Sequence, residues 1–184
     1  MATDLTNISA SMRMVLSITA EKAIDMGSTP SAPLAKSETH APAFGSGDNQ
    51  VNQIWWDTRI LAGAATEDID LAGSLTNAFG ATVTLATAKF IWIHNRSDEV
   101  STSPVHSVAT DAHMTIGNAA ATQFVGPFGA AAHTLTLQAG DWLGISCLKA
   151  GWATTGGALD KLKILNSDAT DELMYDILIL GVSA

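Results

Sequence analysis

The five histidines are the first residues of this chain to weigh for chemistry, because imidazole binds metals and moves protons near neutral pH. A metal site usually places two histidines at alternate positions of one strand or on one helix face. Here the closest two are seven residues apart, and the paired histidines and glutamate of a cupin-type site are missing. The sequence therefore predicts no metal centre. The histidines are His40, His94, His106, His113 and His133.

The densest acidic cluster is formed by Glu67, Asp68 and Asp70. Carboxylates two residues apart in a loop can bind Ca²⁺, although the glycine and distal glutamate of an EF-type loop are absent. A weak calcium site at Asp68 and Asp70 therefore stays open as an alternative. The simpler interpretation is a solvated turn in which one of these aspartates accepts backbone hydrogen bonds.

Nucleophilic chemistry has little support in the sequence. Cys147 is the single cysteine, and it ends the apolar run 142–147, which predicts a buried thiol that packs as a small hydrophobic group. The chain has no phosphate-binding loop, no dinucleotide fingerprint and no nucleophile elbow. A carboxylate pair for glycoside hydrolysis depends on distance in space rather than on spacing, so that alternative stays open. We expect no enzyme and no cofactor.

Charge and composition narrow the partners. Of the 184 residues, 47% are hydrophobic, enough for one domain over residues 1–184 with a sizeable core, and only 15% are charged. The net charge is −9 and the basic residues are scattered, which disfavours direct contact with nucleic acid or an anionic membrane. The first residues do not resemble a signal peptide, so we expect synthesis in a cytoplasm.

The elements that must position these residues are strands. Apolar residues alternate with polar ones over 8–20, which predicts a long strand with one buried face. Strands are also predicted at 51–61, 81–87 and 89–94, and a hairpin over 134–147. In 89–94 the alternation places Phe90, Trp92 and His94 on one face and Lys89, Ile91 and Ile93 on the other. The stretch 172–182 is apolar at both parities, which is typical of a strand buried on both faces.

Residues 27–49 are rich in Ser, Thr, Pro and Gly, and we interpret them as an extended loop or arm. One short helical segment is conceivable over 70–79. About nine strands at regular spacing favour an all-β fold, a single antiparallel β-sandwich that is jelly-roll-like. The residues expected to contact other molecules are aromatic: Trp55, Trp56, Phe44, Phe124, Phe128 and Trp152.

The segment 60–95 contains a characteristic set of glycine, acidic and apolar positions: Gly63, Asp68, Asp70, Leu71, Leu75, Phe79, Gly80, Ala81, Val83, Lys89, Ile91, Ile93 and Asn95. Weaker related blocks lie at 162–166 and 175–181, and together the three blocks cover about a quarter of the chain. With these residues the segment resembles small β-domains of tailed-bacteriophage particles.

The resemblance implies a structural protein of the virion. The expected role is a capsid decoration (cement) protein that binds and stabilises the head lattice as a homo-oligomer, with a trimer as one arrangement. The expected partners are other copies of itself and the major capsid protein or tail subunits. A tail-associated or receptor- and glycan-binding β-sandwich module is the alternative, with Trp152 as a possible platform.

Overall fold

A computed structural model describes residues 7–21, 31–73, 75–100, 109–119 and 122–183. Their regular structure is β-strand, apart from one 3₁₀ turn, η1 (Gly126–Phe128), so the predicted all-β class is confirmed. The described residues form fifteen strands, against about nine predicted, and five of the fifteen contain only two residues. The described part of the conceivable helix over 70–79 contains the short strand β7 (Leu75–Thr76), which pairs with β8 (Thr82–Val83).

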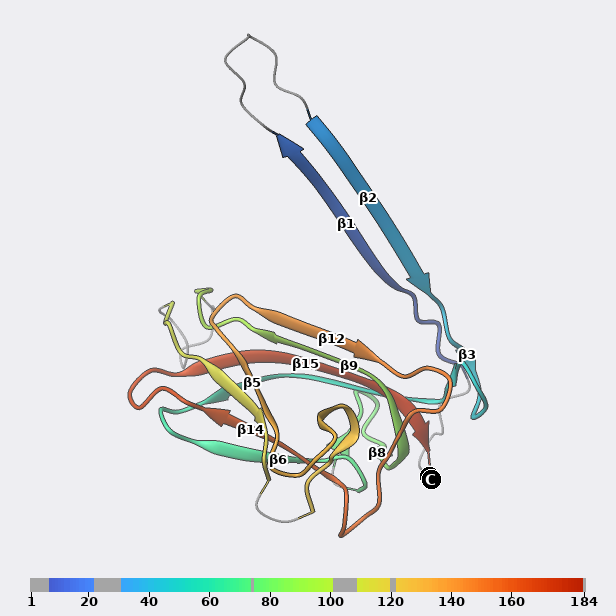
Figure 1. Cartoon of the computed structure of the whole chain (residues 1–184). Coiled ribbons are helices and arrows are strands. Elements are labelled where there is room, and N and C mark those ends of the chain that lie inside the picture. The colour runs from blue at the N-terminus through green and yellow to red at the C-terminus, as the bar shows by residue number, and fades with distance from the viewer. Residues whose placement is uncertain (1–6, 22–30, 74, 101–108, 120–121, 184) are drawn as a thin grey trace, which may run out of the picture.

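Two large antiparallel sheets form the body of the molecule. The first has the order β12-β9-β15-β5, with the short strand β13 beside β9. The second has the order β11-β10-β14-β6. In Figure 1 the second sheet lies below the first. The bounds in the first sheet are β5 (Gln53–Leu61), β9 (Leu85–Asn95), β12 (Trp142–Ser146), β13 (Trp152–Ala153) and β15 (Leu173–Ser183). Those in the second are β6 (Thr66–Asp70), β10 (Met114–Gly117), β11 (Thr134–Leu137) and β14 (Lys161–Asn166).

The hydrophobic core is shared by the two sheets. Side chains of one parity from each strand meet in one buried cluster, because successive residues of a strand point to opposite faces. Ile91 and Ile177 enter it from the first sheet, and Met114 and Ile164 from the second. Strand β15 lies between β9 and β5 and is buried along most of its length, as its double-sided apolar pattern predicts.

The N-terminal part of the chain forms a separate ribbon. Strand β1 (Met12–Glu21) pairs antiparallel with β2 (Ser31–His40), and Figure 1 shows this hairpin projecting away from the two sheets. We call residues 12–21 with 31–40 the arm. The face predicted to be buried over 8–20 is buried only at its beginning, where Ile8 lies in a small apolar cluster. Within the arm the prediction is wrong, because the side chains of 13–19 are exposed.

The predicted loop over 27–49 also needs correction. Residues 31–40 of it form strand β2, although Pro33 lies within it, paired with Thr19. Proline is tolerated there because both strands of a two-stranded ribbon are edge strands, so a missing N–H can face solvent. Residues 27–30 of the predicted loop lie outside the described residues.

The arm is joined to the body by a well-bonded root. Strand β3 (Ala43–Phe44) pairs in parallel with β4 (Gln50–Val51). The buried ammonium group of Lys89, on β9, donates to the carbonyl oxygens of Gly47, Leu148 and Lys149 at 2.8, 3.1 and 3.2 Å. These bonds tie the segment between arm and body to the first sheet.

Two local predictions are wrong for the same reason. Strands β11 and β12 do not form a hairpin: β11 pairs with β10 in one sheet and β12 with β9 in the other. The acidic cluster is not a turn, because it lies in strand β6. There Asp70 forms an ion pair with Lys161 at 2.6 Å and accepts the amide of Ala72 at 3.0 Å. Strand pairing is decided by contacts distant in sequence, which local patterns do not contain.

Candidate functional site

The most distinctive surface of the body is the outer face of the first sheet, which turns away from the core. In its register Trp56, Leu178 and Trp92 are directly opposite one another across β5, β15 and β9. A second row, two residues along each strand, contains Ile54, Leu180 and Phe90, and it packs against Ile8 and Val51 of the same chain. Because outward positions of a solvated sheet are usually polar, this face is unusually apolar. We call it the outer face.

Tryptophans dominate the accessible part of the outer face. Trp56 is 49% exposed and Trp142 is 60% exposed, while Trp92 is half-buried. A Cβ atom at Gly144 would lie 3.5 Å from the Trp142 ring and 3.7 Å from the Trp92 ring, so the missing side chain leaves room for both. The His94 ring lies 5.8 Å from that of Trp92. The result is an apolar surface that contains three tryptophans, with Leu178 between Trp56 and Trp92. Large exposed apolar patches usually mark binding sites.

The arm carries a second exposed apolar surface. Met14, Leu16 and Ile18 share one face of β1, and Leu34 of β2 is opposite Ile18. Their exposed fractions lie between 45% and 61%. The opposite face of β1 carries Arg13, Val15, Ser17 and Thr19 and is more polar. On the same face, β2 places Lys36, Glu38 and His40 opposite Leu16, Met14 and Met12, so this face is apolar along β1 and partly charged along β2. A two-stranded ribbon is only marginally stable by itself in water, so a partner surface would stabilise it.

A groove separates the arm from the outer face. It encloses about 760 Å³ and is lined by Met12 and Met14 from the arm and by Phe90, Trp92 and Trp142 from the sheet. Polar groups at its edge include Glu38 and His40 of β2. Two apolar surfaces of one chain thus face each other across open space.

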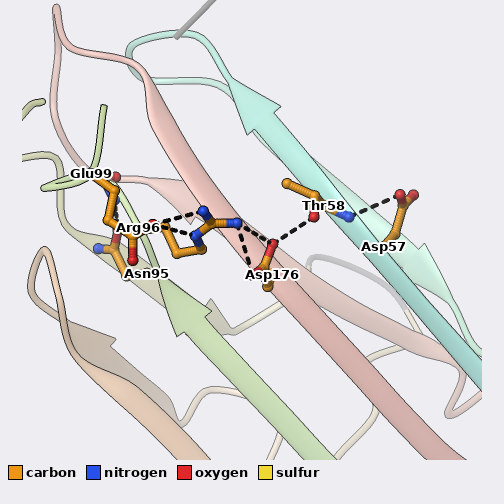
Figure 2. Close-up of polar contacts among 7 residues, drawn as sticks. Asp57, Thr58, Asn95, Arg96, Glu99 and Asp176 are labelled. Atoms are coloured by element: carbon orange, nitrogen blue, oxygen red, sulfur yellow. Dashed lines mark hydrogen bonds and ion pairs between the residues drawn. The ribbon is translucent and has the colours of Figure 1, made fainter. Parts of the chain in front are cut away.

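A polar network borders the outer face at one end. Figure 2 shows Arg96, just after β9, between Glu99 and Asp176 of β15. Arg96 donates to Asp176 Oδ2 at 3.1 Å and to Glu99 Oε2 at 2.8 Å, and the Thr58 hydroxyl donates to Asp176 Oδ1 at 2.6 Å. The hydrogen bond from Arg96 lowers the pKa of the Glu99 carboxyl. These bonds hold the ends of β5, β15 and β9 together.

A second polar cluster lies on the core side of the first sheet. The buried Tyr175 hydroxyl donates to Glu67 Oε1, and Arg59 donates to Glu67 Oε2 at 2.6 Å while its guanidinium lies 5.4 Å from the Trp55 ring centre. Burial, followed by the nearby Glu67 charge, raises the pKa of Tyr175, which stays protonated as a donor. Because these partners satisfy one another inside the fold, the cluster stabilises it rather than facing a ligand.

Acid should weaken the fold through carboxylates whose pKa is depressed. Amide hydrogen bonds from Asp171 and Thr170 lower the pKa of Asp168, and the hydrogen bond from Arg96 lowers the pKa of Glu99. A carboxyl whose pKa is lower in the folded than in the unfolded protein stabilises the fold at every pH above its unfolded pKa, which is about 4. This stabilisation is lost as the pH falls through the folded-state pKa. We expect urea midpoints to be similar at pH 7 and 5.5 and to fall towards pH 3. Asp168→Asn should make this acid limb shallower, and an unchanged limb in that variant would contradict the assignment.

The six aromatic residues predicted for contacts fall into different environments. Trp56 lies on the outer face, and Phe44 is 39% exposed at the arm root. Trp55 and Phe124 are buried in the core, where they have no surface to offer another molecule. Phe128 and Trp152 are partly buried and pack against that core. The structure therefore brings only Trp56 to the aromatic surface.

Sequence reasoning missed Trp92, Trp142 and the apolar arm face as contact residues. The predicted parity of β9 is confirmed, with Phe90, Trp92 and His94 on one face and Lys89, Ile91 and Ile93 on the other. Nothing in that parity says which face is the core. The sequence does contain one signal: β9 and β1 each carry large apolar side chains on the face that lies outside the core.

The residues first weighed for chemistry are dispersed. His40 lies in β2, His94 on the outer face and His133 near β11, and His106 lies outside the described residues. Among the residues that the structure describes, no three His, Cys, Asp or Glu side chains gather where they could hold a metal ion. Cys147 is half-buried rather than buried. Over the same described ranges, no helix is long and apolar enough to cross a membrane.

The chain was also compared with known proteins. No protein-family model, no curated protein and no solved structure matches it.

Proposed function

We propose that this chain is a structural subunit of a tailed-bacteriophage virion, a decoration protein that binds the head lattice as an oligomer. The observation that carries the proposal is the pair of unpartnered apolar surfaces, the arm face and the outer face with Trp56, Trp92 and Trp142. A free subunit with two such surfaces exposes apolar area that assembly would remove from water. The resemblance of 60–95 to phage β-domains suggests that this assembly is a virion.

We also infer a jelly-roll sandwich as the architecture of the body. Eight strands of the two large sheets can be numbered in chain order from β5 to β15, omitting the short β13. The first sheet then reads 1-8-3-6 and the second 2-7-4-5. This order of two interleaved four-stranded sheets is that of a jelly roll, a fold widespread in viral capsid proteins. It supports a virion role by analogy of fold alone.

The proposed role is mechanical rather than catalytic. Its partners are other copies of the chain and a capsid or tail subunit, and its action is burial of apolar and neutral polar surface. With a net charge of −9, direct binding to nucleic acid is not part of the proposal. The place of action is the virion.

A glycan-binding tail module is the second candidate. The groove beside Trp92 and Trp142 combines aromatic rings with Glu38, His40 and His94 at its edge. Sugars stack on exposed tryptophan faces while their hydroxyl groups bond to polar side chains. This candidate uses the same surface as the first, so the location of the protein on the particle separates the two.

Labelling of intact particles tests the proposal. Serum raised against the chain, followed by gold-conjugated antibody, should mark the whole head surface in electron micrographs. Pre-immune serum, and the same serum absorbed with the pure protein, are the controls. Label confined to one end of the particle would favour the glycan-binding tail module, and a glycan array would then be the next assay. Particles without any label would contradict a virion role.

A further inference from the structure

The arm is held at its base and cannot be treated as a loose tail. Ile8, Val51 and Leu180 form a small buried cluster, against which Met12, Ile54 and Phe90 pack. The amide of Asn49 donates to the carbonyl oxygen of Leu148 at 2.9 Å, next to the carbonyls that bind Lys89. The base of the arm is therefore fixed on the outer face, while the rest extends beyond it (Figure 1).

This anchoring leaves the arm unable to cover its own outer face completely. Only the basal part of the arm, residues 12–15 with Glu38 and His40, lines the groove. Leu16, Ile18 and Leu34 lie farther along the arm with about half of their surface exposed. The outer face keeps Trp56 and Trp142 exposed at the same time. Each chain thus has an apolar ribbon to offer and an apolar sheet that can receive one.

We propose that the arm of one copy docks on the outer face of a second copy, in a reciprocal exchange that closes a symmetric assembly. The inference deepens the proposed function by naming its self-association interface. Met14, Leu16 and Ile18 of one copy pack on Trp56, Trp92 and Trp142 of the next. Because each copy gives its arm to the same partner from which it receives one, the pair has twofold symmetry and is closed, whereas arms passed only onward would form an open-ended chain.

The available area is sufficient for such an interface. Each strand of the arm has ten residues, and a ribbon of this length is about 33 Å long and about 10 Å wide. One docked arm then buries about 330 Å² on each partner, and two exchanged arms about 1,300 Å² in total, within the range of specific interfaces. The apolar β1 side of the ribbon also suits a sheet on which Trp56 and Trp92 lie in one row and Trp142 lies beside it.

The distribution of charge also favours the arm of a second copy as the segment that docks on the outer face. The segment 7–40 contains three basic residues, Arg13, Lys22 and Lys36, and three acidic ones, Glu21, Asp25 and Glu38, so it is neutral. The net charge of −9 is carried by the rest of the chain. A neutral ribbon can approach the acidic body of another copy without the repulsion that two bodies would meet.

The test is the mass of the full-length protein in solution, by sedimentation velocity over a range of micromolar concentrations. The wild type should be oligomeric. The arm variant Leu16→Glu/Ile18→Glu should weaken self-association by at least about tenfold, because it places charges in an apolar interface. The face variant Trp56→Ser/Trp142→Ser should do the same. The matched control, Ser17→Glu/Thr19→Glu, adds the same charge to the other face of the same strand and should associate like the wild type.

Mixing the two defective variants adds a sharper readout. The face variant keeps an intact arm and the arm variant keeps an intact outer face, so the mixture should form a pair joined by one docked arm, although neither variant associates alone. Circular dichroism like that of the wild type shows that each variant is folded. If one variant is misfolded, the exposed single variants Leu16→Glu and Trp142→Ser replace the doubles.

A monomeric wild type would overturn the exchange, and so would an arm variant that associates as strongly as the wild type. Equal weakening by the control variant would also overturn it, because the effect would then be charge alone. These results are separable from the proposed function. If the antibody labels the heads but the free protein is monomeric, the decoration role stands and the exchange fails. If the free protein is oligomeric but the particles carry no label, the exchange stands and the decoration role fails.

Discussion

Asn95→Asp should lower the free energy of unfolding by about 3 kcal/mol at neutral pH, one of the largest effects of any single-atom exchange in this protein. Asn95 is fully buried at the end of β9, and its Nδ2 donates to the carbonyl oxygens of Ala112 and Leu137 at 2.9 and 3.2 Å. Those carbonyls belong to segments that flank or end strands of the second sheet. An aspartate there would turn a carboxylate towards two acceptors and break a link between the sheets.

The measurement is urea denaturation followed by tryptophan fluorescence. Asn118→Asp is the matched control, because Asn118 is exposed and should change stability by less than about 0.5 kcal/mol. The lost stability should be partly regained in mild acid, because the buried carboxyl would have a raised pKa and, once protonated, could donate one hydrogen bond. Equal stability of the two variants would show that the Asn95 contacts do not join the sheets.

The same arrangement recurs at the end of β14, in Asn166. This buried side chain donates to the carbonyl oxygens of Leu61, Ala62 and Asp171 at 3.2, 3.0 and 2.7 Å, and its Oδ1 accepts the amide of Asp168 at 3.0 Å. It thereby ties a strand of the second sheet to the ends of two strands of the first. Asn166→Asp should therefore behave like Asn95→Asp, and the pair of variants tests the interpretation at two independent places.

Lys89→Met should lower the free energy of unfolding by about 2–3 kcal/mol and loosen the root of the arm. The ammonium group is almost completely buried, and its bonds to three carbonyl oxygens hold Gly47 against the loop at 148–149. Methionine keeps most of the side-chain volume but leaves these carbonyls without their donor. Hydrogen exchange should therefore quicken at the amide of Asn49, whose bond to Leu148 depends on the same segment.

Lys149→Met is the control for this second prediction, since Lys149 lies in the same loop, carries the same charge and is exposed. It should leave both stability and exchange unchanged. Self-association separates the two roles of the root: Lys89→Met should weaken it more than its loss of stability would explain, because the arm loses its fixed direction. If both lysine variants lose stability equally, net charge rather than the buried bonds is responsible.

How much could be predicted differs from element to element. The alternation in 89–94 correctly separated Phe90, Trp92 and His94 from Lys89, Ile91 and Ile93, because the parity of a strand is a local property of the backbone. The doubly apolar pattern of 172–182 correctly indicated a central strand. In contrast, the pairing of 134–147 was predicted wrongly, since the turn at 138–141 carries the chain from one sheet to the other.

The residue types and a period of two were enough to predict the class of the fold, several of its strands and the two faces of those strands, but not β2 and β6. The tertiary structure decided which face is core. Trp55 and Trp56 are neighbours, yet one is buried and the other 49% exposed. The alternating face of β1, which in isolation predicts burial, is exposed because the hairpin leaves the body. Burial requires a second layer, and the position of that layer depends on contacts between residues far apart in the chain.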